Sequence, residues 1–102
     1  MASEGYHEPV EKLDTGVVDR HRAIASIMEE LEAIDWYDQR ASATEDPGLR
    51  AILAHNRDEE KEHAAMALEW LRRHDEVFDR HLRTYLFTEA PITEIEEQAE
   101  AT

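Results

Sequence analysis

Glu60 and His63, three residues apart, are the side chains in this sequence best placed to hold a metal ion together. In an α-helix, this spacing puts a carboxylate and an imidazole on adjacent turns of one face, within reach of a single ion. The spacing alone carries little weight, because 17 Glu and 6 His in 102 residues give about one such match by chance. The stretch Glu4-Gly-Tyr-His7 is another match, and we attribute it to chance.

The surroundings of Glu60 and His63 make this pair informative. Both lie midway along an apolar stripe, where a charged side chain needs a partner or a metal ion. Glu30 lies at the edge of an earlier apolar stripe, about as far before the connector as Glu60 lies after it. In an antiparallel hairpin, Glu30, Glu60 and His63 would therefore sit at nearly the same height. They would form either a metal site or an ion-paired, solvated patch.

Apolar residues at intervals of three and four predict the first helix, over about residues 8–40. These residues are Val10, Leu13, Val17, Ile24, Ile27, Leu31 and Ile34. Asp46 followed by Pro47 is typical of an N-cap and a first helical position, which predicts a second helix over about residues 47–74. A short helical tail is expected over about residues 75–99. The predicted fold class is all-α, an antiparallel two-helix hairpin with a short C-terminal helix.

Length and composition restrict the possible classes of protein. A chain of 102 residues fits a single helical-hairpin domain over 1–102. The net charge of −14 argues against nucleic acid and anionic membranes as partners. The chain has no cysteine, which excludes disulfides and thiolate metal sites. It also has no apolar run long enough for a membrane span and no export signal at its N-terminus, so a cytoplasmic setting is expected.

Two such helices cannot cover their own apolar surface, because a lone hairpin touches along a single line. We therefore expect two hairpins to dimerise into a ferritin-like four-helix bundle, the alternative being a monomer whose tail folds over the groove. The ligand count indicates a dimer as well. Ferritin-like di-iron bundles use one Glu from each of two helices and one Glu-x-x-His from each of the other two. This chain supplies half of that set.

Four stretches of the sequence closely resemble the encapsulated ferritins, which are cargo of bacterial encapsulin shells. They are Met28-Glu-Glu-Leu-Glu-Ala-Ile-Asp-Trp-Tyr-Asp-Gln-Arg40, Leu53-Ala-His-Asn-Arg-Asp-Glu-Glu-Lys-Glu-His-Ala-Ala-Met66, Leu68-Glu-Trp-Leu-Arg-Arg73 and Leu82-Arg-Thr-Tyr-Leu-Phe-Thr88. The resemblance extends from about His7 to Thr93. It implies a metal-bridged dimer and a ring of such dimers, usually a decamer, inside an encapsulin nanocompartment of the bacterial cytoplasm. The family usually carries a targeting peptide after its helices, and none is visible up to Thr102.

The resemblance also implies a function. Glu30, Glu60 and His63 match the catalytic ligands of a ferroxidase centre, in which two chains hold two iron ions. The expected activity is oxidation of Fe(II) to Fe(III) by O₂, for iron storage and detoxification. Two rival hypotheses remain: a metal carrier without redox turnover, and a purely structural helical oligomer.

Further residues of the first helix match positions around the centre in that family. Tyr37 matches a tyrosine close behind the iron ligands. Glu29 and Glu32 match an outer site through which metal enters, with Trp36 beside it. Without the resemblance, Glu29 and Glu32 are typical of a solvated helix face. Tyr37 could equally well pack in an interface or orient the Glu30 carboxylate.

Overall fold

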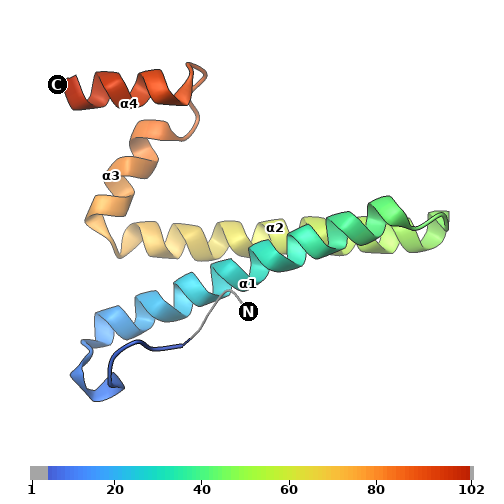
Figure 1. The fold of residues 1–102 in the computed structure, drawn as a ribbon, viewed down its shortest axis with the longest axis horizontal. Coiled ribbons are helices and arrows are strands. Elements are labelled where there is room, and N and C mark those ends of the chain that lie inside the picture. Colours follow the sequence, from blue (N-terminus) through green and yellow to red (C-terminus); the bar gives the residue numbers. More distant parts are fainter. Residues whose placement is uncertain (1–4, 102) are drawn as a thin grey trace. The chain divides into compact units, whose positions relative to one another are not determined.

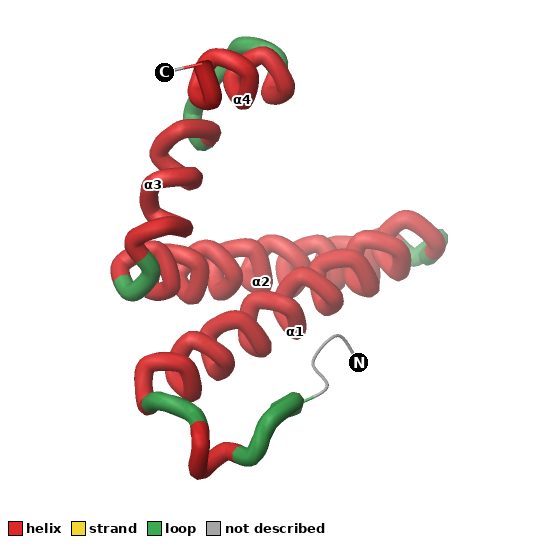
Figure 2. The backbone as a smooth tube through the Cα atoms, turned by 60° about the vertical axis from the view of Figure 1, so that its left-hand side comes forward, coloured by secondary structure: helices red, strands yellow, loops and turns green. Residues whose placement is uncertain are grey.

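The computed structural model describes residues 5–101, and within this range it contains helices and no strands (Figure 1, Figure 2). A 3₁₀ helix, η1, precedes four α-helices. The bounds are η1 Val10–Lys12, α1 Thr15–Ala43, α2 Pro47–Arg73, α3 Glu76–Tyr85 and α4 Ile92–Ala101. The predicted all-α class is confirmed. In the described part of the chain, no helix is long and apolar enough to cross a membrane.

The chain divides into two compact units, the first ending at Leu71 and the second beginning at Arg72. In the first unit, α1 and α2 run antiparallel as a hairpin (Figure 1, Figure 2). Near the turn, Arg50 Nε donates to the Ala41 carbonyl at 3.0 Å. Further along, Arg57 Nη1 lies 3.0 Å from Asp38 Oδ1. The residue farther from the turn on α2 thus pairs with the residue farther from the turn on α1. The two contacts fix the register of the antiparallel hairpin.

Helix α1 begins at Thr15, and not near residue 8 as the sequence predicted. The apolar residues Val10 and Leu13 belong to the 3₁₀ turn, where the Leu13 N–H donates to the Val10 carbonyl at 3.0 Å. A spacing of three fits a 3₁₀ helix as well as an α-helix, so the pattern alone cannot separate them. The backbone then becomes extended at Leu13 and Asp14, and α1 starts after this N-cap. At its other end, α1 continues to Ala43, past the predicted end near residue 40.

Helix α2 runs from Pro47 to Arg73, one residue shorter than the predicted range of about 47–74. Asp46 Oδ2 accepts a hydrogen bond from the Leu49 N–H at 2.7 Å, the contact that an N-cap aspartate makes. Arg50 also donates to the Thr44 carbonyl. The turn at residues 44–46 is therefore held by the side chains of Asp46 and Arg50.

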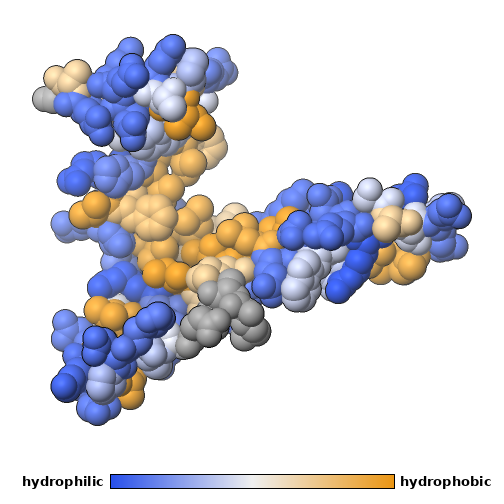
Figure 3. Space-filling model, viewed as in Figure 1, coloured by the Kyte–Doolittle hydropathy of each residue, from blue (hydrophilic) through white to orange (hydrophobic). Residues whose placement is uncertain are grey.

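The hairpin buries few of its apolar side chains completely. Within the described residues, the buried apolar side chains are Ala41 and Leu71. Three members of the predicted seam on α1 remain exposed: Val17 by 38%, Ile24 by 44% and Leu31 by 55%. Figure 3 shows apolar side chains in orange on the surface of the molecule. This exposed apolar surface is what the predicted pairing of two hairpins would cover.

The second unit contains α3 and α4, which contact each other. The tail predicted over residues 75–99 thus forms two helices joined by an irregular segment. Asp75 Oδ1 accepts from the Phe78 N–H at 3.0 Å and caps α3. Asp79 on α3 accepts hydrogen bonds from Arg72 and from Arg83. Within the second unit, the Asp79 carboxylate thus joins the first turn of α3 to Arg72.

Candidate metal centre

Glu30 on α1 and Glu60 and His63 on α2 lie together in the first unit. His63 Nδ1 is 3.7 Å from Glu30 Oε2 and 3.6 Å from Glu60 Oε2. One ligand atom from each of the three residues lies within 4.8 Å of the others. Among residues 5–101, no other group of three or more His and carboxylate side chains lies close enough together to hold one metal ion. The hairpin therefore brings together the three residues that the sequence predicted to meet.

The two carboxylates of the cluster are more shielded from solvent than its imidazole. The side chains of Glu30 and Glu60 are 25% and 24% exposed, whereas that of His63 is 44% exposed. Metal bonds to imidazole nitrogen and carboxylate oxygen are about 2.0–2.2 Å long, so two atoms bound to one ion lie at most about 4.4 Å apart. His63 Nδ1 lies within that limit of both Glu30 Oε2 and Glu60 Oε2. Carboxylates with imidazole form a donor set that suits iron.

The other predicted residues lie on α1 outside this cluster. Glu29 is exposed and Glu32 is half-buried, and they form no group of three ligands with another described residue. Trp36 is 50% exposed. The guanidinium carbon of Arg40 lies 6.0 Å from the Trp36 ring centroid and 5.6 Å from that of Tyr37. The guanidinium of Arg40 thus lies near both Trp36 and Tyr37. The sequence did not predict this contact.

Arg57 makes a contact between the helices that sequence reasoning missed. Its side chain is 25% exposed and pairs with Asp38 on α1 and with Asp58 on α2. The hydrogen bond from Arg57 is the main reason why the pKa of Asp58 is lowered, and those to Asp58 and Asp38 raise the pKa of Arg57. The Arg57-Asp58 neighbours were visible in the sequence. The link to Asp38 could be found only once the helix register was known.

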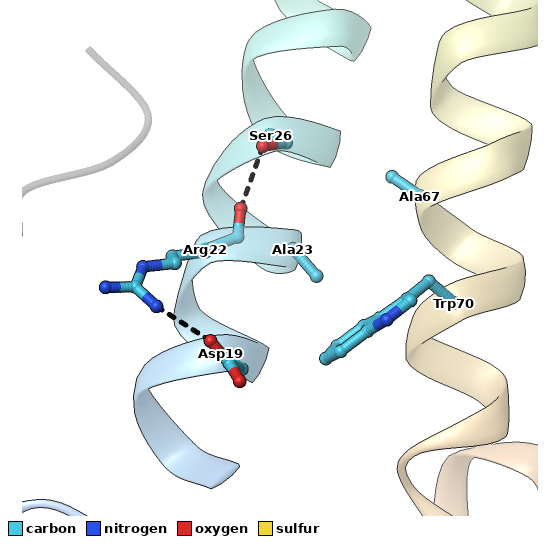
Figure 4. Close-up of a pocket in the computed structure, with 6 residues that line it drawn as sticks. All are labelled: Asp19, Arg22, Ala23, Ser26, Ala67 and Trp70. Carbon is cyan, nitrogen blue, oxygen red and sulfur yellow. Dashed lines mark hydrogen bonds and ion pairs between the residues drawn. The ribbon is translucent and has the colours of Figure 1, made fainter. Parts of the chain in front are cut away.

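A recess of about 460 Å³ lies between the two helices (Figure 4). It is lined by Asp19, Arg22, Ala23, Ser26, Ala67 and Trp70. In Figure 4 the Trp70 ring points across from α2 toward α1. Arg22 Nη1 lies 2.8 Å from Asp19 Oδ1, so the one carboxylate of the lining already has a cationic partner. The recess therefore offers no second set of metal ligands.

Comparisons with known proteins show the family of the chain. Residues 5–89 match the family model described as EncFtn-like. The chain is 70% identical over 96 residues to the "Encapsulated ferritin-like protein" of Rhodospirillum rubrum, covering 94% of this chain and 69% of that protein. It is 57% identical over 96 residues to the "Ferritin-like protein" of Thermotoga maritima, covering 94% of this chain and 84% of that protein.

A solved structure is similar as well. The crystal structure of protein ne0167 from Nitrosomonas europaea has a TM-score of 0.84 and 61% sequence identity, covering 87% of this chain and 98% of that chain. The family match extends over most of the sequence, and two relatives named as ferritin-like match nearly all of it. The chain therefore belongs to the EncFtn-like family.

Proposed function

We propose that this protein is a ferroxidase that oxidises Fe(II) to Fe(III) with O₂ at a di-iron centre formed between two chains. The observation that carries the proposal is the cluster of Glu30, Glu60 and His63, which is half of the ligand set of a ferritin-like centre. Membership of the EncFtn-like family supports it. Iron is the substrate in this proposal, bound as Fe(II) and released as Fe(III).

A second copy of the chain completes the centre. Two hairpins related by a two-fold axis present the same surface to each other, so each contributes Glu30, Glu60 and His63. The four carboxylates of the pair neutralise the charge of two divalent ions. The exposed apolar side chains of α1, such as Ile24 and Leu31, provide the surface that holds the copies together. Dimers of this kind would assemble further into a ring, for which we propose a decamer.

The ligands determine which oxidation state the centre favours. Each Fe(II) gives up one electron, and one O₂ takes both electrons and two protons to become hydrogen peroxide. Carboxylate oxygens are hard ligands and stabilise the ferric product. His63 binds iron through a ring nitrogen of its neutral imidazole. Glu29 and Glu32 with the net charge of −14 raise the concentration of Fe(II) near the centre.

An encapsulin compartment is the proposed location. The relative from Rhodospirillum rubrum is named as an encapsulated ferritin-like protein. A ring of dimers encloses no mineral cavity of its own, unlike a closed ferritin shell. Storage of the ferric product therefore needs a separate compartment, which an encapsulin shell would provide in the bacterial cytoplasm.

The test is iron oxidation by the wild-type protein and by two glutamate variants. Fe(II) is bound anaerobically at two ions per two chains, air is admitted, and ferric absorbance and O₂ consumption are followed. Glu60→Ala removes a proposed ligand, and Glu62→Ala removes an exposed carboxylate on the same helix. We expect oxidation well above the buffer rate in the wild type and in Glu62→Ala, and none above it in Glu60→Ala.

The same experiment separates the rival functions. Fe(II) that binds tightly but is oxidised no faster than in buffer would indicate a metal carrier. A chain that binds no Fe(II) would be a structural oligomer. Equal loss of oxidation in Glu60→Ala and Glu62→Ala would show that general acidity, and not the cluster, attracts the iron.

A further inference from the structure

Met66 lies one helical turn beyond His63 on α2, and its side chain is 59% exposed. Residues three apart on a helix have Cβ atoms about 5–6 Å from each other. The long, unbranched methionine side chain can turn its sulfur toward a neighbouring position on the same face. The chain contains no cysteine, so its oxidisable sulfur atoms are methionine thioethers, and Met66 carries one of them on the same helix face as His63.

Met28 provides a comparison within the same molecule. It lies two residues before Glu30 on α1, and residues two apart on a helix do not face each other. Its side chain is half-buried, whereas that of Met66 is exposed. The two methionines are thus similarly close to a proposed ligand in sequence, but they differ in direction and, within the single chain, in exposure.

We propose that Met66 is a modification site, oxidised to the sulfoxide by hydrogen peroxide formed at the centre. The inference rests on the proposed function, because iron oxidation supplies the peroxide. A lone pair of the Met66 sulfur attacks one peroxide oxygen, the O–O bond breaks, and the other oxygen leaves as water after proton transfer. The sulfur loses two electrons and the peroxide gains two. Each Met66 thus removes one molecule of peroxide, and a methionine sulfoxide reductase with its electron donor must restore the thioether before the next round.

The first test locates the oxygen atom. Wild-type protein is loaded with Fe(II) anaerobically and exposed to air, ferric absorbance is recorded, and the same sample is digested for peptide mass spectrometry. We expect several-fold more sulfoxide at Met66 than at Met28, and no such preference in Glu60→Ala with the same iron. Normal ferric absorbance with equal oxidation of Met66 and Met28 would overturn the inference alone. Absence of ferric absorbance would overturn the proposed function as well.

A second arm separates the position of Met66 from its exposure. Metal-free protein is treated with hydrogen peroxide from solution, at the amount that turnover would generate. The preference for Met66 over Met28 should be clearly smaller here than during turnover, because the oxidant no longer starts beside His63. An identical preference in both arms would mean that exposure alone selects Met66, and would contradict the inference.

A third measurement tests the removal of peroxide. Met66→Leu keeps the apolar volume nearly constant while removing the sulfur. This variant should oxidise Fe(II) at the wild-type rate and release more peroxide in the first turnover, as measured with a peroxidase-coupled dye. Equal peroxide release by the two proteins would refute removal by Met66.

Discussion

His63 Nδ1 on α2 lies 3.7 Å from Glu30 Oε2 on α1, although the two residues are far apart in the sequence. The same nitrogen lies 3.6 Å from Glu60 Oε2 on its own helix. The candidate centre thus joins the two helices of the hairpin, and its geometry depends on their register. An ion bound by all three residues would stabilise the closed hairpin, since it binds the folded form only.

Metal should drive the association of the chains. Without metal, the paired clusters would place four carboxylates close together, where they repel one another. Adding Fe(II) or Co(II) at one ion per chain should raise the mass measured by sedimentation at least to that of a dimer. Glu60→Ala should show no such increase. An unchanged mass of the wild-type protein at this ratio would contradict a centre shared by two chains.

Arg57→Met should loosen the hairpin. The substitution removes the ion pair that links α2 to Asp38 on α1. We expect a lower Tm for metal-free Arg57→Met than for wild type. Arg22→Met is the matched control, because Arg22 pairs with Asp19 on the same helix and both side chains are largely exposed. An equal decrease in Tm for both variants would show that the ion pair between the helices stabilises the chain no more than the ion pair within one helix.

Stability of the second unit should depend on pH through Asp79. Hydrogen bonds from Arg72, and to a smaller extent from Arg83, lower the pKa of Asp79 below its ordinary value of 3.8. A group with a lowered pKa in the folded state stabilises that state above its unfolded pKa, and this stability is lost as the pH falls through the folded value. Asp79→Asn should therefore increase hydrogen exchange in α3 at neutral pH.

The difference between Asp79→Asn and wild type should fade as the pH falls below 3.8, where the wild-type carboxylate becomes protonated. Exchange rates are compared with those of each protein's unstructured reference at the same pH. A difference that stays constant across this range, or that is missing at neutral pH, would rule out the ion pairs of Asp79 as the cause.

Phe87→Gly should not destabilise the metal-free chain. Phe87 has a φ of 60° and a fully exposed side chain, so the substitution removes a backbone penalty and no packing within the described residues. A left-handed conformation costs a residue other than glycine roughly 1–2 kcal/mol, part of which is recovered by the change to glycine. Urea denaturation should give an unchanged or higher free energy of unfolding. A clear decrease would mean that the Phe87 ring contributes to stability.

The sequence was sufficient to predict that Glu30, Glu60 and His63 lie close together. Residues at equal distances from the connector of an antiparallel hairpin lie at the same height, because each residue advances a helix by the same rise, and these three also lie on or beside the apolar stripes. The start of α2 was equally accessible, since aspartate before proline has a specific capping geometry. Whether the cluster binds iron, and whether Glu29, Glu32 and Tyr37 assist it, stays a prediction.

Other features could not be read from the sequence, for physical reasons. Val10 and Leu13 continue the apolar spacing of α1, yet they form a 3₁₀ turn whose repeat is also three. The pairing of Arg57 with Asp38 depends on the register and on the rotamers of two long side chains. The left-handed backbone at Phe87 has no sequence signal, because such positions favour Gly or Asn.

The central claim is that two iron ions are held next to each other by two chains. It is tested most directly by Mössbauer and EPR spectra of the protein loaded with Fe(II) at one ion per chain and then exposed to air. Two Fe(III) ions held next to each other in one centre would couple magnetically, so we predict the diamagnetic Mössbauer signature of a coupled pair and no EPR signal from isolated Fe(III). A strong EPR signal from isolated high-spin Fe(III), accounting for most of the added iron, would contradict a shared di-iron centre.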